Sequence, residues 1–283
     1  MSGNPIRRIL QSTAAFAVLV LFGSADEPQA PSTAMVAEPR PIDSWKQRHE
    51  SIFKQSQKGG VDVAFAGDSI TQRWESEGKD VWDESFPAWK PINLGIGGDS
   101  TQHILWRITT GKVLVGIDPK VIVLLIGTNN IASHKPAEIA IGVKMIVAEL
   151  RKQKPRARIL VLGLLPRSGK PVPDRDELAP ADHLQPLIGS TNALLNTFRD
   201  DHVRFLDLGK LFLNSNGDLP RSVMLDFLHL STAGYRILAK ALAQPVDDML
   251  NDMPTSRSLA NVALQRVDAC REHLMMWVSV GDR

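Results

Sequence analysis

The stretch from Val61 to Thr71 places the strongest constraint on how this chain can fold. Its first half, Val-Asp-Val-Ala-Phe-Ala, is a short apolar run of strand type, and it ends in Gly-Asp-Ser before a polar, helix-compatible stretch. A strand that enters a helix through a tight turn is typical of an open α/β sheet, in which ligands bind at the carboxyl ends of the strands. Such a turn presents Ser69 to a crevice, beside backbone N–H groups of the following helix. Ser69 is therefore a candidate nucleophile, although most serines in front of a helix are N-caps.

The same alternation of strand and helix continues along the chain. Strands are expected at 61–66, 91–94, 121–126, 158–162 and 203–206, and helices at 45–58, 101–110, 136–152, 182–200 and 232–250. The run at 121–126 is wholly apolar, as in a strand that is buried on both faces. This order of elements predicts an α/β protein with a parallel, doubly wound sheet and right-handed crossovers.

The N-terminus has the pattern of a targeting segment. Arg7 and Arg8 precede an apolar run at 14–22, and small residues follow at 23–25. A basic start, a short apolar run and a small-residue cleavage site are typical of a signal peptide, so we interpret residues 1–25 as a signal peptide or an uncleaved membrane anchor. An exported, periplasmic or extracellular protein is expected, with attachment to a membrane through the uncleaved segment as the alternative.

Three further segments follow in the predicted domain organisation. Residues 26–44 are rich in Pro, Ala and small polar residues and predict a linker. The globular domain is expected at 45–252, and a C-terminal helical extension at 253–283, where apolar residues recur near helical spacing. A shortened chain that starts near Pro41 is therefore expected to fold and to be as active as a longer one.

Composition excludes several classes of function. The chain is 43% hydrophobic and 23% charged, and 33 Lys and Arg against 31 Asp and Glu give a net charge of +2, so nothing favours a nucleic-acid partner. Cys270 is the single cysteine, which excludes an intramolecular disulfide and a cysteine-based metal site. No His-Glu-x-x-His or other metal-ligand spacing is present, so no metal is expected.

Polar or glycine-rich clusters follow each of the first three predicted strands, at 67–69, 97–99 and 127–129. Because the carboxyl ends of parallel strands meet at one edge of a sheet, these clusters are expected to build a site together. A fourth polar pair, Asp226 and His229, precedes the last predicted helix of the domain. The sequence therefore predicts one site at this edge of the sheet.

The predicted site contains the groups that acyl transfer requires. Ser69 would attack a carbonyl, and His229 would take its proton and return it to the leaving group. Asp226 would orient the imidazole and stabilise it when charged. The backbone N–H groups of Ser69 and Gly98 and the side-chain amide of Asn129 suit the oxyanion of the tetrahedral intermediate. Glycine at position 98 lets the backbone approach a ligand without an intervening Cβ.

Each of these groups also has a purely structural explanation. Residues 95–98 alone would be a tight turn, and their spacing differs from the dinucleotide fingerprint Gly-x-Gly-x-x-Gly. Asn129 alone is a common turn residue, and His229 alone would be a histidine satisfied by Asp226. Asp99 or Ser100 is expected to cap the helix that follows, and the cap role is the simple explanation for Asp99. The catalytic hypothesis therefore rests on the four clusters taken together.

These four clusters resemble the SGNH, or GDSL, hydrolase superfamily. The resemblance lies in Gly-Asp-Ser at 67–69, the glycine block at 95–98, Gly-x-Asn at 127–129 and Asp-x-x-His at 226–229, in this order. Within the superfamily, the sequences GIGGDSTQHILWR, VLGLLPR and DFLHLS are similar to the catalytic (alpha) subunits of intracellular platelet-activating-factor acetylhydrolase. The similarity extends over residues 45–250.

The resemblance implies a fold, an activity and a set of roles. The fold would be a flavodoxin-like three-layer α/β/α sandwich with a five-stranded parallel sheet. Ser69 would be the nucleophile, Asp226 and His229 would complete the triad, and Gly98 and Asn129 would contribute to the oxyanion hole. The activity would be hydrolysis of short-acyl esters, acetyl esters first, without a cofactor.

The export-like start and the C-terminal extension depart from that subfamily. The expected substrate is therefore a small-molecule, glycan or lipid ester, with no choice made among the three. A lysophospholipase or thioesterase would use the same residues. A catalytically idle carbohydrate- or partner-binding module is the alternative from another class, but such a module has no need of Asp226 beside His229. A homodimer also remains open.

Overall fold

The computed structural model describes residues 32–168, 176–178 and 184–251. Within them lies a five-stranded sheet in the order β2-β1-β3-β4-β6, and every neighbouring pair is parallel. The strands are β1 (Val63–Gly67), β2 (Pro91–Asn93), β3 (Val121–Leu125), β4 (Arg158–Leu162) and β6 (Val203–Leu206). The predicted α/β class and parallel sheet are confirmed: β4 and β6 match their expected ranges fully, and the other three strands match within two residues at each end.

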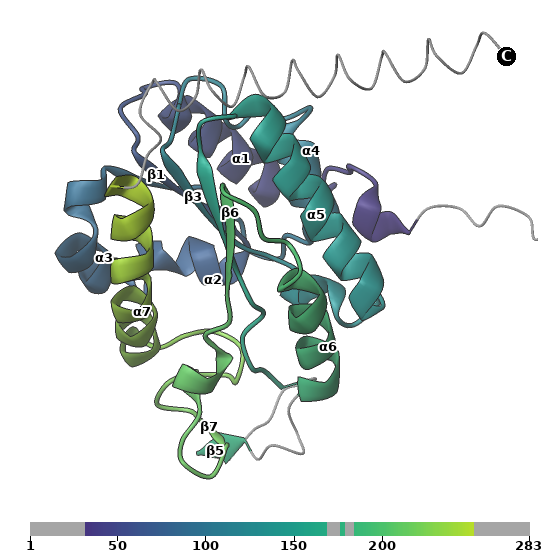
Figure 1. The fold of residues 1–283 in the computed structure, drawn as a ribbon, viewed down its shortest axis with the longest axis vertical. Helices are drawn as coiled ribbons and strands as arrows, with labels where there is room; N and C mark the ends of the chain where they lie inside the picture. Colours follow the sequence, from purple (N-terminus) through teal and green to yellow (C-terminus); the bar gives the residue numbers. More distant parts are fainter. Residues whose placement is uncertain (1–31, 169–175, 179–183, 252–283) are drawn as a thin grey trace, which may run out of the picture. The chain divides into compact units, whose positions relative to one another are not determined.

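Helices cover both faces of this sheet (Figure 1). They are α1 (Asp43–Ser56), α2 (Ser69–Gln72), α3 (Lys79–Ser85), α4 (Thr101–Ile108), α5 (Pro136–Gln153), α6 (Gln185–Leu195) and α7 (Thr232–Asn251). Successive strand residues point to opposite faces: Ala64 packs with the side chains of α1, α4 and α5, whereas Phe65 packs with those of α3 and α7. The result is the three-layer sandwich that the resemblance implied.

The segment between α2 and β2 contains helices that the sequence pattern did not predict. After α2 come a 3-10 turn at Arg73–Glu75, then α3, then a 3-10 turn at Pro87–Trp89. Their apolar side chains are few and large. Trp74, Trp82, Phe86 and Trp89 of this segment form one aromatic cluster with Phe65 of β1 and Tyr235 of α7. Aromatic packing therefore orders a segment that has no clear helical periodicity.

The predicted linker packs on the domain where the structure describes it. Residues Thr33–Met35 form a 3-10 turn in which Ala34 is fully buried. The Thr101 hydroxyl donates to the Ala34 carbonyl at 2.8 Å, and this carbonyl lies so close to Gly142 of α5 that a Cβ there would come within 2.5 Å of it. Small residues at these contacts let the segment lie against α4 and α5, so it belongs to the folded domain.

The two predicted terminal segments, at 1–25 and 253–283, lie outside the described residues. Within the described part of the chain, no helix is both long and apolar enough to cross a membrane.

The packed segment changes what is expected of a shortened chain. A form that starts at Ser32 should be as stable as the full chain, whereas one that starts at Pro41 loses the buried Ala34 and the hydrogen bond from Thr101. We expect that loss to lower the free energy of unfolding by about 1–3 kcal/mol, since the buried hydroxyl keeps only a long hydrogen bond to Gln102 Oε1, at 3.4 Å. Urea denaturation of both forms measures the difference. Equal stability would show that the contacts of residues 32–40 add nothing to the fold.

Candidate active site

Ser69 is placed by the junction of β1 and α2. The carboxylate of Asp68 caps the helix, with Oδ1 accepting the N–H of Ile70 at 2.9 Å. The N-cap role that the sequence left open for Ser69 therefore belongs to Asp68, and the Ser69 hydroxyl is available for another partner. Gly67 permits the tight turn, because a Cβ there would lie 2.2 Å from Thr71 Oγ1.

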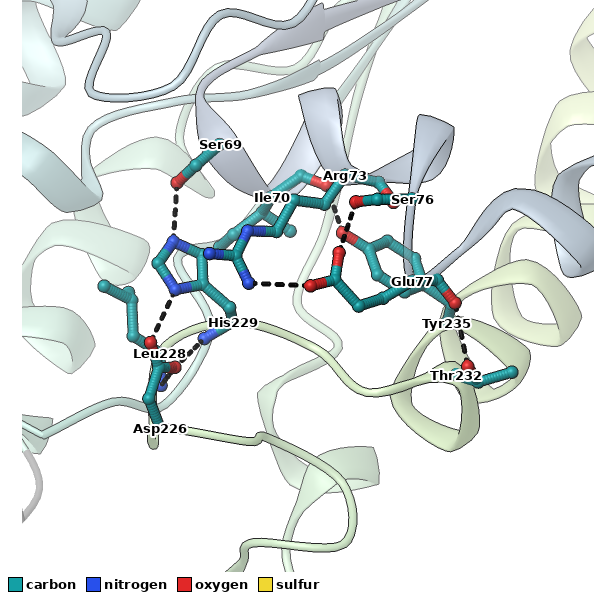
Figure 2. Close-up of polar contacts among 10 residues, drawn as sticks. All are labelled: Ser69, Ile70, Arg73, Ser76, Glu77, Asp226, Leu228, His229, Thr232 and Tyr235. Carbon is teal, nitrogen blue, oxygen red and sulfur yellow. Dashed lines mark hydrogen bonds and ion pairs between the residues drawn. The ribbon is translucent and has the colours of Figure 1, made fainter. Parts of the chain in front are cut away.

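That partner is His229, although the two residues are 160 positions apart in the sequence. Nε2 of His229 lies 2.9 Å from Ser69 Oγ, and Nδ1 lies 2.7 Å from Asp226 Oδ2. Figure 2 shows the three side chains in one line, with Oδ1 of Asp226 also accepting the backbone N–H groups of Leu228 and His229 at 3.1 and 2.7 Å. The structure thus brings together the three residues predicted as nucleophile, base and orienting carboxylate.

A strained and buried residue shapes the loop that carries Asp226 and His229. Phe227 lies between them with φ of 58°, which is uncommon for a bulky residue, and its ring is fully buried. Its carbonyl accepts the N–H of Ser168 at 2.9 Å, and the Arg221 guanidinium lies 4.7 Å from its ring centre. Buried contacts of this kind can hold a backbone conformation that is costly by itself, as often occurs at functional sites.

The electrostatics of the loop favour an ionised Asp226. Partial burial by itself would raise the pKa of this carboxyl, but the hydrogen bonds from the His229 ring and from the two backbone N–H groups outweigh it, and the pKa is lowered. A carboxylate here holds the proton of the imidazole on Nδ1, which leaves Nε2 free to accept a proton from Ser69.

The three donors predicted for an oxyanion follow three strands of the sheet: Ser69 comes after β1, Gly98 after β2 and Asn129 after β3. Among the described residues, the N–H groups of Ser69 and Gly98 have no hydrogen-bond acceptor, so both are available to a ligand. Gly98 has φ of 78°, a conformation that favours glycine. The side-chain amide of Asn129 donates one N–H to the carbonyl of Asp99 at 2.8 Å and keeps a second N–H.

Asp99 has a different role from the helix cap that the sequence suggested. Ser100 is the N-cap of α4, and the carboxylate of Asp99 is fully buried. It accepts hydrogen bonds from Trp45 Nε1 at 2.6 Å and from Arg107 Nη1 at 3.0 Å, while Arg107 Nη2 donates to the carbonyl of Leu94 at 2.7 Å. This network holds the loop on which Gly98 lies, and through the Asp99 carbonyl it also orients Asn129.

Two more charged residues beside the site were not singled out from the sequence. Asp68 is fully buried, its Oδ2 has no hydrogen-bond partner among the described residues, and burial raises its pKa to about 7 against the opposing effect of the Ile70 N–H. The charge of Arg167 favours the ionised form of Asp68, and its Nη1 donates to the carbonyl and hydroxyl of Thr128 at 3.2 and 3.3 Å. Arg167 therefore steadies the turn that precedes Asn129.

Comparison with known proteins places this site in a family. The model of the GDSL-like Lipase/Acylhydrolase family matches residues 65–237, which include all five predicted site residues. The chain belongs to this family. It is a carboxylic ester hydrolase. Within the described residues, no group of three His, Cys, Asp or Glu side chains could hold a metal ion.

Named relatives agree with this assignment. Platelet-activating factor acetylhydrolase IB subunit alpha2 from Rattus norvegicus is 37% identical over 215 residues, which cover 76% of this chain and 89% of the relative. Subunit alpha1 from Mus musculus is 38% identical over 198 residues, covering 70% and 80%. A GDSL-like lipase from Bacteroides thetaiotaomicron VPI-5482 shares the fold, with a TM-score of 0.54, 17% identity, and coverage of 71% of this chain and 97% of that one.

The buried pair of Asp99 and Arg107 should dominate the stability of this loop. Replacing Arg107 by Met leaves Asp99 buried without its counter-ion, and we expect the free energy of unfolding to fall by about 3–5 kcal/mol. The exposed pair of Arg236 with Glu84, at 2.9 Å, offers a matched control, and Arg236→Met should cost less than about 1 kcal/mol. Urea denaturation near pH 7 measures both. Similar losses in the two variants would contradict the role given to the buried pair.

Proposed function

We propose that the enzyme hydrolyses short-acyl esters, acetyl esters first, with Ser69 as nucleophile. The observation that carries this proposal is the unbroken line of hydrogen bonds from Ser69 Oγ through His229 to the carboxylate of Asp226. A serine hydroxyl is a weak nucleophile unless an adjacent base takes its proton, and this base must itself be oriented by a third group. The hydrogen bonds of His229 to Ser69 and to Asp226 fit both requirements.

The reaction would proceed in two halves. Ser69 Oγ attacks the ester carbonyl while its proton passes to Nε2 of His229, and Asp226 stabilises the imidazolium. When the tetrahedral intermediate collapses, the bond to the alcohol oxygen breaks, and that oxygen receives the proton from Nε2. Water then attacks the acyl-serine carbonyl while His229 takes its proton. When this second intermediate collapses, the bond to Ser69 Oγ breaks, that oxygen receives the proton from Nε2, and the acid is released.

The negative oxygen of both intermediates would lie among the N–H groups of Ser69, Gly98 and Asn129. All three come from segments that follow strands of the sheet, and each is held before substrate arrives, Asn129 by its bond to the Asp99 carbonyl. Donors that are already oriented cost no rearrangement in the transition state.

The acyl preference is supported by the names of the relatives, since proteins 37% identical to this chain are called acetylhydrolases. A lysophospholipase or a thioesterase would use the same steps on a longer chain or a different leaving group. A series of p-nitrophenyl esters of rising acyl length separates these, followed by acetylated glycans and phospholipids. Highest kcat/KM on the acetyl ester is expected, and a steady rise towards long acyl chains would contradict the short-acyl proposal.

Ser69 and His229 should behave as one catalytic unit. His229→Ala should remove most of the turnover of p-nitrophenyl acetate, and adding Ser69→Ala should cost little more, because the members of such a unit are not additive. An organophosphonate ester should label Ser69 in the unsubstituted enzyme, as mapped by mass spectrometry. Labelling of a different serine, or full activity of Ser69→Ala, would show that the nucleophile has been misassigned.

Asn129 should act separately, on the developing charge. Asn129→Ala removes one oxyanion donor and should lower kcat by roughly 100- to 1,000-fold, with KM and the phosphonate labelling site unchanged. Steady-state kinetics on p-nitrophenyl acetate give both constants. A higher KM with kcat intact would identify Asn129 as a contact to bound substrate instead.

A further inference from the structure

Arg40 lies against the oxyanion loop, although it comes from the segment that the sequence predicted as a linker and lies outside the residues matched by the family model. Its Nη1 donates to the carbonyl oxygen of Gly97 at 2.7 Å. The same guanidinium occupies the space beside Gly98: a Cβ built on Gly98 would lie 2.5 Å from Arg40 Nη1 and 3.0 Å from its central carbon. Glycine at position 98 therefore makes room for this side chain as well as for a substrate.

The carbonyl that Arg40 contacts belongs to a particular peptide group. The C=O of Gly97 and the N–H of Gly98 are the two ends of one amide, and this N–H is a proposed oxyanion donor. Hydrogen bonds polarise one another along a chain, and a bond from a cation is stronger than one from a neutral donor. A guanidinium on the carbonyl end therefore makes the N–H end a better donor to a negative oxygen.

The preceding peptide group, between Ile96 and Gly97, is also held in place. The N–H of Gly97 donates to Oε1 of Gln72 at 2.6 Å, which ties the loop to the end of α2. Arg40 and Gln72 thus contact the amide groups on either side of the Gly97 Cα. Because the peptide bond is planar, the direction of the Gly98 N–H depends on where these two contacts hold the Gly97 carbonyl.

The positive charge of Arg40 is not cancelled nearby. Arg40 is half-buried, and among the described residues it forms no ion pair. It interacts electrostatically with the carboxylate of Asp99, which is already bonded to Arg107 and Trp45. Burial and the charge of Arg40 together lower the pKa of His103 to about 4, so this neighbour stays neutral at working pH and adds no second positive charge.

We propose that Arg40 is a positioning residue of the oxyanion hole, which orients and polarises the Gly97–Gly98 peptide group for the tetrahedral intermediate. The inference rests on the proposed function, in which the Gly98 N–H binds the oxyanion. Because a neutral ester carbonyl gains little from a polarised donor and an oxyanion gains much, Arg40 acts on kcat and leaves KM almost unchanged.

Arg48 supplies a matched control. It also comes from the N-terminal part of the domain and also donates to a carbonyl of the same loop, with Nε 3.2 Å from the oxygen of Gly95. The N–H of that peptide group belongs to Ile96 and donates to the Gly67 carbonyl at 3.2 Å, so it is not an oxyanion donor. Losing Arg48 removes a contact to the same loop, together with its ion pair to Glu75 at 2.6 Å, without touching the proposed donor.

The experiment compares Arg40→Met with Arg48→Met in the full chain, on p-nitrophenyl acetate. Arg40→Met should lower kcat about tenfold, the size expected for one charge-assisted hydrogen bond, with KM within about twofold. Arg48→Met should change kcat by less than about twofold. Added methylguanidinium should restore part of the kcat of Arg40→Ala and have no effect on Arg48→Ala, a rescue that a loss of folding would not show.

Wild-type kcat in Arg40→Met would overturn the inference, as would an equal fall of kcat in both Met variants or a rise in KM alone. Ser69→Ala and Asn129→Ala, measured beside them, separate this failure from that of the proposed function. If both lose activity as expected and Arg40→Met does not, only the role of Arg40 is wrong. If Ser69→Ala keeps its activity, the catalytic assignment itself fails.

Discussion

The buried ion pair between Asp99 and Arg107 is the contact on which the candidate active site most depends. Both side chains are buried, so each charge needs the other as its counter-ion. The Trp45 N–H donates to Oδ1 of Asp99, and the Leu94 carbonyl accepts from Nη2 of Arg107. The pair stands directly beside Gly98, and the Asp99 carbonyl holds Asn129. A charge interaction behind the loop thereby sets the positions of two of the three proposed oxyanion donors.

The site lies at the carboxyl edge of a parallel sheet, and most of it is built from the turns that follow the strands. The tight turn after β1 presents Ser69, while the turn after β3 presents Asn129 and is steadied by Arg167. Asp226 and His229 come from a loop that does not follow a strand of this sheet, and the strained, buried Phe227 fixes their geometry instead. Rigid strands supply the nucleophile and the donors, and a packed loop supplies the base.

The N-terminal segment, which lies outside the residues matched by the family model, also contacts the candidate site. Ala34 is buried against α4 and α5, and six residues later Arg40 reaches the Gly97 carbonyl. The same contacts that stabilise the segment therefore bring a cation to the oxyanion loop. Folding of this segment and the proposed polarisation of the Gly98 N–H are linked physically, because Arg40 is held in place only while the segment is packed.

The amino-acid sequence by itself determined the class of fold and the five proposed site residues. Apolar runs of strand length alternate with helical periodicity, and Gly-Asp-Ser and Asp-x-x-His stand in separate local clusters, so both kinds of signal are contained in short stretches. Only the tertiary structure decided that Asp99 is a buried counter-ion and not a cap, that the segment from Ser32 belongs to the domain, and that Arg40 lies against Gly98. These contacts join residues that are far apart in the sequence, such as Ala34 and Gly142, and no local pattern encodes them, because they depend on which surfaces the folded helices bring together.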